Sequence, residues 1–152
     1  MKKTELRKQY FKIRNKLGDT KEKDLMIVEN LKTIINDYKK IGIYFSINNE
    51  PNIMRLLNDK QMFYVPYCYK DKHLMEYRQL LFPTFLNKII KDEAGISSTT
   101  QQSDNELDVI IAPSILANPK GYRLGYGRGY YDIFLKDKNC LKIICTYDDL
   151  VK

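Results

Sequence analysis

Apolar positions near the amino terminus have helical spacing. They recur every three or four residues over residues 2–17, which predicts an amphipathic helix that Gly18 ends as a C-terminal cap. Asp19 or Thr20 can cap a second helix, which runs to about Tyr38. The side chains predicted to face inward from this second helix are Leu25, Val28, Leu31, Ile34 and Ile35.

Short apolar runs later in the chain predict strands at residues 41–45, 62–66, 73–80, 107–112 and 141–146. A short helix is expected after Pro51 and another at about residues 130–137, whereas residues 92–105 lack a pattern and predict a loop. Strands that alternate with helices are typical of an α/β fold with a mainly parallel sheet. We therefore predict a single three-layer α/β/α domain over residues 1–152.

The segment at residues 118–135 reads NPKGYRLGYGRGYYDIFL and is rich in glycine, arginine and tyrosine. Its three alternating glycines let the backbone turn tightly and bring N–H groups close to an anion. A helix expected to begin at Gly129 or Tyr130 would point its positive end at the same place. Arg123 and Arg128 add charge suited to phosphate oxygens. The segment predicts a polyphosphate site, with a structural turn and a nucleic-acid contact as the alternatives.

The string from Arg123 to Asp132, RLGYGRGYYD, closely resembles the signature of the 5-formyltetrahydrofolate cyclo-ligase family, R-L-G-x-G-K/R-G-Y-Y-D. In that family a strand of the form L-D-x-I-x-x-P comes before it, and here residues 107–113 read LDVIIAP. The resemblance also covers the amino-terminal helix and the strands between. It implies an ATP- and Mg²⁺-dependent enzyme that closes 5-formyltetrahydrofolate to 5,10-methenyltetrahydrofolate and releases ADP and phosphate.

The resemblance also implies roles for individual residues. The ATP-binding set is Lys3, Arg7, Arg14, Arg123, Leu124, Gly125, Tyr126, Gly127, Arg128, Gly129, Tyr130 and Tyr131. The folate-binding set is Phe45, Glu50, Tyr126 and Tyr130. Arg128 is expected to be the catalytic residue beside the transferred phosphoryl group, and Asp132 to hold Mg²⁺.

The residues themselves leave alternatives open. Lys3, Arg7 and Arg14 lie within roughly 40° of each other on a helix, so they form either a ridge over a pocket or a solvated face. Glu50 follows a strand, where α/β sheets place ligands, but it also precedes a helix whose dipole it would favour. Asp132 has the same alternative role at a helix start, and the tyrosines could belong to the core.

Composition narrows the class of protein. The chain has 43% hydrophobic and 30% charged residues, as a globular protein does, and no apolar run long enough to span a membrane. A net charge of +7 suits either anionic small molecules or nucleic acid. The resemblance favours ATP and folate as partners over nucleic acid. Three cysteines without metal-ligand spacing predict reduced thiols. The positive amino terminus lacks the apolar stretch of a signal peptide, so we expect a cytoplasmic protein. The expected state is a monomer or a weak dimer.

The match to the family ends before its last strand. Family members generally continue to a strand with acidic residues, one of them a second metal ligand, and this sequence stops at Lys152. We therefore expect the C-terminal strand of the fold to be missing. The alternative functions that follow are a catalytically impaired nucleotide- or folate-binding relative and a basic RNA-binding protein.

Overall fold

The structure is a computed structural model that describes residues 2–152. The strands of its central sheet are β1 (Lys40–Gly42), β2 (Met62–Tyr69), β3 (Leu74–Leu80), β6 (Val109–Pro113) and β9 (Leu141–Cys145). The order across the sheet is β3–β2–β1–β6–β9. β1, β2, β6 and β9 are parallel, and β3 pairs antiparallel with β2 at one edge. The prediction of a mainly parallel α/β sheet is confirmed.

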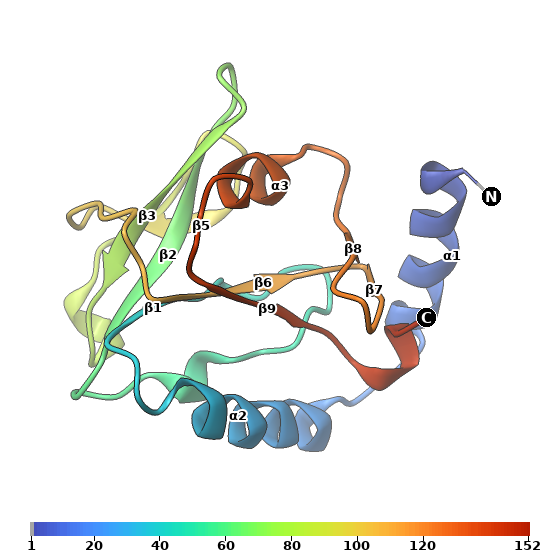
Figure 1. The fold of residues 1–152 in the computed structure, drawn as a ribbon, viewed down its shortest axis with the longest axis horizontal. Coiled ribbons are helices and arrows are strands. Elements are labelled where there is room, and N and C mark those ends of the chain that lie inside the picture. Colours follow the sequence, from blue (N-terminus) through green and yellow to red (C-terminus); the bar gives the residue numbers. More distant parts are fainter. Residues whose placement is uncertain (1) are drawn as a thin grey trace.

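Three α-helices and two small strand pairs surround this sheet (Figure 1). The helices are α1 (Lys3–Asn15), α2 (Lys21–Ile35) and α3 (Tyr130–Leu135). The strand pairs are β4 (Ile89–Lys91) with β5 (Ser97–Thr99), and β7 (Leu116–Ala117) with β8 (Arg123–Leu124). Short 3₁₀ helices lie at Met54–Leu56, Thr84–Leu86 and Asp148–Leu150. Within residues 2–152, no helix combines the length and the apolar character needed to cross a membrane.

Helices cover both faces of the sheet, because the sheet is apolar on both sides. Val109 and Ile111 of β6 belong to one core cluster, which includes Leu31 of α2. Ile110 points to the other face and belongs to a second cluster, which includes Tyr130 of α3. All five residues of β6 are buried, as expected for a parallel strand between two helical layers. Figure 1 shows α2 and α3 on opposite sides of the sheet, with α1 standing beside β7 and β8.

Several local predictions were wrong at their boundaries. α2 ends at Ile35, before Tyr38, and Leu25 and Ile34 are 37% and 48% exposed, so they do not face the core. The buried stripe of α2 is therefore narrower than the apolar stripe of its sequence. The predicted loop at residues 92–105 contains β5, which pairs with β4. A short hydrogen-bonded hairpin of mixed composition has no strong alternation to reveal it.

Candidate functional site

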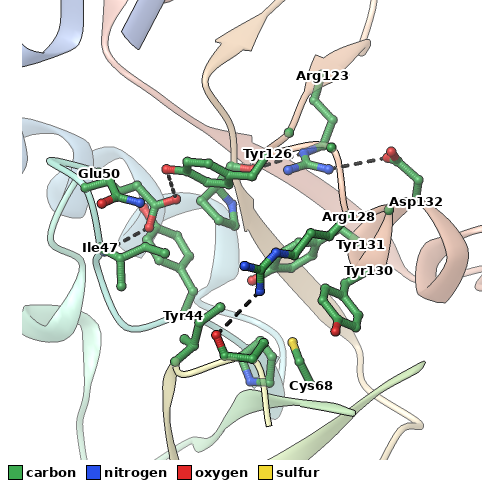
Figure 2. Close-up of a pocket in the computed structure, with 18 of the residues that line it drawn as sticks. Tyr44, Ile47, Glu50, Cys68, Arg123, Tyr126, Arg128, Tyr130, Tyr131 and Asp132 are labelled. Carbon is green, nitrogen blue, oxygen red and sulfur yellow. Dashed lines mark hydrogen bonds and ion pairs between the residues drawn. The ribbon is translucent and has the colours of Figure 1, made fainter. Parts of the chain in front are cut away.

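A cavity of about 590 Å³ opens at the carboxyl ends of the parallel strands. Tyr44 and Phe45 line it just after β1, Cys68 lines it from β2, and Pro113 lines it from the end of β6. β1 pairs with β2 on one side and with β6 on the other. The chain runs from β1 to β2 and later returns to the other side of β1 as β6, so the strand order reverses at β1. Such a reversal is the usual ligand position in open α/β sheets. Figure 2 shows the side chains that surround this cavity.

Residues 125–129, here called the glycine segment, form one wall of the cavity. Gly127 and Gly129 have φ angles of 95° and 74°, a left-handed conformation that favours glycine. A Cβ atom at Gly127 would lie 3.3 Å from Cζ of Arg7, so the guanidinium of α1 packs directly on the loop. Arg7 Nε also donates a hydrogen bond to the carbonyl oxygen of Gly125 at 2.8 Å. α1 therefore holds the loop in place through a residue that also lines the cavity.

Four cationic side chains line the cavity: Lys3, Arg7, Arg123 and Arg128. Arg123 is fixed, because its Nε donates to the carbonyl oxygen of Pro113 at 3.0 Å and its guanidinium lies 5.1 Å from the ring of Tyr131. Arg128 is exposed, and its Nη1 donates to the carbonyl oxygen of Ala94 at 3.4 Å. Arg128 therefore spans from the glycine segment to the turn between β4 and β5, and little holds it there.

A buried carboxylate lies elsewhere on the cavity wall. Glu50 is 4% exposed, and its Oε1 accepts a hydrogen bond from the backbone N–H of Ile47 at 2.9 Å. Its Oε2 accepts a hydrogen bond from the hydroxyl of Tyr126 at 3.0 Å. Burial raises the pKa of Glu50, and these two hydrogen bonds offset part of that effect. Asn48 and Asn49 have φ angles of 49° and 62°, which turn the chain so that Glu50 faces Ile47.

Asp132 is the residue predicted to hold Mg²⁺. Its side chain is 68% exposed at the cavity, and its Oδ1 lies 3.3 Å from Nη1 of Arg123. Within residues 2–152, no group of three or more His, Cys, Asp or Glu side chains could hold a metal ion alone. Mg²⁺ bound with a nucleotide commonly uses one or two carboxylates together with phosphate oxygens and water. One exposed carboxylate beside four cationic side chains suited to phosphate fits that pattern.

Most residues of the predicted sets line this one cavity, including Phe45, Glu50, Tyr126, Tyr130 and Tyr131. Arg14 and Leu124 do not. Arg14 is 1% exposed and lies behind Tyr126, where it donates to the Tyr126 hydroxyl and to the carbonyl oxygen of Ser114. Leu124 belongs to β8, and its carbonyl oxygen accepts a hydrogen bond from the N–H of Ile115. The predicted phosphate contact of Arg14 does not agree with this placement, because the Arg14 side chain is buried against Tyr126 and Ser114.

The sequence interpretation missed the wall formed by residues 94–97. Asp92 builds this wall: its Oδ1 accepts from the N–H groups of Ala94 and Ile96, both at 2.9 Å. Its Oδ2 accepts from the N–H of Cys68 at 2.9 Å, which ties the turn to β2. The signal in the sequence was an aspartate three residues before Gly95, a common turn pattern. It could have predicted the turn, though not its position at the cavity.

Comparisons with known proteins agree with this geometry. Residues 1–149 match the model of the 5-formyltetrahydrofolate cyclo-ligase family. The solved structure of an Aquifex aeolicus 5,10-methenyltetrahydrofolate synthetase is similar with a TM-score of 0.81 and 26% identity, covering 99% of this chain and 80% of that one. A Mycoplasma pneumoniae 5,10-methenyltetrahydrofolate synthetase has a similar fold, with a TM-score of 0.68 and 23% identity over 91% of this chain and 80% of that one. A search of curated protein sequences gave no match. Because the family model matches nearly the whole chain, the protein belongs to the 5-formyltetrahydrofolate cyclo-ligase family, whose members are ligases.

Proposed function

We propose that this protein uses Mg²⁺ and ATP to convert 5-formyltetrahydrofolate to 5,10-methenyltetrahydrofolate, with release of ADP and phosphate. One observation carries the proposal: a single cavity holds four cationic side chains and a buried carboxylate, Glu50. Figure 2 has Glu50 on one side and Asp132 on the other, with Arg128 between them. A polyphosphate needs cations, whereas a ring that donates hydrogen bonds needs an acceptor such as a carboxylate. A site for both substrates therefore requires that the cations and Glu50 lie at different ends of the cavity.

The folate would bind at the Glu50 end. A carboxylate can accept about four hydrogen bonds, and Glu50 accepts two within the protein. Each oxygen of Glu50 can therefore accept one more, from the N–H groups of the aminopyrimidine. Phe45 and Tyr126 line the cavity nearby and offer aromatic surface to the pterin ring.

The triphosphate would bind at the other end, against the backbone N–H groups of the glycine segment and the cationic side chains. Mg²⁺, when bound, neutralises phosphate charge, and Asp132 is the residue that would hold it. Arg123 pairs with Asp132 and lies between the glycine segment and the end of β6. It would therefore order the phosphate end of the cavity before the nucleotide enters.

The reaction needs alignment and charge neutralisation more than covalent help from the protein. The formyl oxygen attacks the γ-phosphorus of ATP, and the bond to ADP breaks. The neighbouring folate nitrogen then attacks the formyl carbon, phosphate leaves with the former formyl oxygen, and the nitrogen loses its proton. Arg128 is exposed and weakly held, so it can follow the transferred phosphoryl group and stabilise the charge that develops there.

A direct assay tests this function. The purified protein is mixed with Mg-ATP and 5-formyltetrahydrofolate, and the near-ultraviolet absorbance of the methenyl product is followed. We expect a rise that requires ATP and disappears when Mg²⁺ is chelated. No rise, with both substrates shown to bind by calorimetry, would refute catalysis and leave a protein that only binds them.

A further inference from the structure

Arg14 is the largest buried charged side chain of the described core and does not line the cavity. Its Nη1 donates to the carbonyl oxygen of Ser114 at 3.1 Å, and its Nη2 donates to the hydroxyl of Tyr126. The guanidinium also lies 4.8 Å from the ring centroid of Phe11. Within residues 2–152, Arg14 forms no ion pair with a carboxylate in direct contact. A buried arginine normally has a charged partner, so its position needs an explanation.

The partner is one side chain further away. The Tyr126 hydroxyl accepts from Arg14 and donates to Oε2 of Glu50 at 3.0 Å. A phenol has a single proton, so this direction of donation leaves both Tyr126 and the ionised Glu50 satisfied. Arg14, Tyr126 and Glu50 thus form a chain from the buried face of α1 to the cavity. The charge of Arg14 is compensated across the phenol by the carboxylate.

We propose that Arg14 is a positioning residue for folate binding, which fixes the Tyr126 hydroxyl and through it the Glu50 carboxylate that receives the pterin. This inference rests on the proposed function, since the pterin is the ligand assigned to Glu50. It moves Arg14 from the phosphate end of the site to the folate end. A phosphate role would require Arg14 to leave a site where it is 1% exposed.

Two arginines of α1 would then act at the two ends of the cavity. Arg7 holds the carbonyl oxygen of Gly125, and Arg14 holds the side chain of the next residue, Tyr126. Arg7 also lines the cavity beside Lys3, at the end assigned to phosphate. Loss of Arg7 should therefore weaken nucleotide binding, whereas loss of Arg14 should weaken folate binding.

Electrostatics around Glu50 support the coupling. Burial raises the pKa of Glu50, and the positive charges of Arg14 and Arg123 both act to lower it. Other titratable groups near Glu50 are neutral at physiological pH: burial raises the pKa values of Tyr44 and Tyr131, that of Tyr126 to about 12 and that of Cys145 to about 11. Removing Arg14 would thus delete one of the two nearby cations that favour the charged form of Glu50.

The first test measures the Glu50 titration without any ligand. The ¹³C shift of its carboxyl carbon is followed by NMR in the wild type and in Arg14→Met, with the signal assigned by its loss in Glu50→Gln. We expect the midpoint to rise by about one pH unit in Arg14→Met. Tyr126→Phe keeps the ring, deletes the donor and should also raise the midpoint, which covers the case in which Arg14→Met folds poorly. The matched control is Arg55→Met, at an exposed arginine of the 3₁₀ helix Met54–Leu56 that does not line the cavity, and it should leave the Glu50 midpoint unchanged.

The second test separates positioning from general loosening of α1. Binding of 5-formyltetrahydrofolate and of Mg-ATP is measured separately by calorimetry. Arg14→Met should weaken folate binding about 10-fold and leave Mg-ATP binding unchanged. Arg14→Lys keeps the charge but lacks the fork that reaches two acceptors, so it should restore part of the folate affinity.

An unchanged Glu50 midpoint in both Arg14→Met and Tyr126→Phe would overturn the inference. Equal losses of folate and nucleotide affinity in Arg14→Met would also overturn it, because they would indicate a displaced helix. Wild-type protein that binds Mg-ATP but no folate would instead refute the folate part of the proposed function. The titration would still report whether Arg14 and Glu50 are coupled, so the two failures are distinguishable.

Discussion

Gly127→Ala tests how α1 and the glycine segment form the end of the cavity that we propose binds phosphate. Gly127 has a φ of 95°, and an alanine there carries a cost of about 1–2 kcal/mol for the left-handed backbone. At about 2–4 °C per kcal/mol for a chain of this size, the melting temperature should fall by about 2–8 °C. The new Cβ would also lie 3.3 Å from Cζ of Arg7, so the guanidinium must move by a few tenths of an ångström.

That movement disturbs the 2.8 Å hydrogen bond from Arg7 to the carbonyl oxygen of Gly125 and shifts a cation of the cavity. Arg7 is also one of the cations proposed to contact the triphosphate. A hydrogen bond from a charged group contributes about 1.5–3 kcal/mol, so weakening the Arg7–phosphate contact by roughly half would cost about 4- to 13-fold in affinity. We therefore expect Gly127→Ala to bind a non-hydrolysable Mg-ATP analogue about 10-fold more weakly. Isothermal calorimetry measures the affinity, and thermal unfolding without ligand measures the strain.

Gly121→Ala is the matched control. Gly121 has a φ of 92°, but a Cβ there would meet no atom within 4 Å, and the residue does not line the cavity. It should lower the melting temperature by a similar amount and leave nucleotide affinity unchanged. If Gly127→Ala bound the analogue as tightly as the wild type, the role given to the Arg7 contact would be refuted. An equal loss of affinity in Gly121→Ala would attribute the effect to strain alone.

Three further predictions concern the site. Arg128→Ala should lower turnover about 100-fold or more and change nucleotide affinity little, because the residue would act on charge that develops during transfer; unchanged steady-state turnover would contradict this role. Burial raises the pKa of Glu50, so the contribution of Glu50 to the free energy of unfolding falls as pH rises from about 4.5 through that raised value. Glu50→Gln lacks this pH-dependent contribution. The melting temperature of Glu50→Gln, relative to that of the wild type, should therefore rise with pH. A difference that does not change with pH would refute the raised pKa of Glu50. Asp132→Asn should raise the Mg²⁺ concentration needed for half-maximal product formation; an identical Mg²⁺ dependence would exclude Asp132 as a ligand.

The sequence predicted the regular elements well where their periodicity was strong. The amphipathic pattern of residues 2–17 became α1, and the apolar run at residues 107–112 became β6, buried on both faces. The sequence-based prediction was wrong where the burial of a residue depended on the elements packed against it. Ile34 has the spacing of a core residue, but α2 packs on the sheet through a narrow stripe and leaves it 48% exposed. The β4–β5 hairpin depends on the carboxylate of Asp92, which hydrophobic spacing cannot reveal.

The sequence by itself predicted an anion site and determined where the backbone must turn. Gly127 and Gly129 have left-handed backbone conformations, in which residues with a Cβ atom are strained. The need for glycine at these positions is therefore local. Only the tertiary structure decided which charges meet. Arg7 and Arg14 are one heptad apart on α1, and their spacing suggests one role, but Arg7 enters the cavity and Arg14 is buried behind Tyr126. The physical reason is that a long side chain reaches several ångströms from its helix, so its role depends on the surface packed against that helix. Here that surface comes from residues a hundred or more positions away.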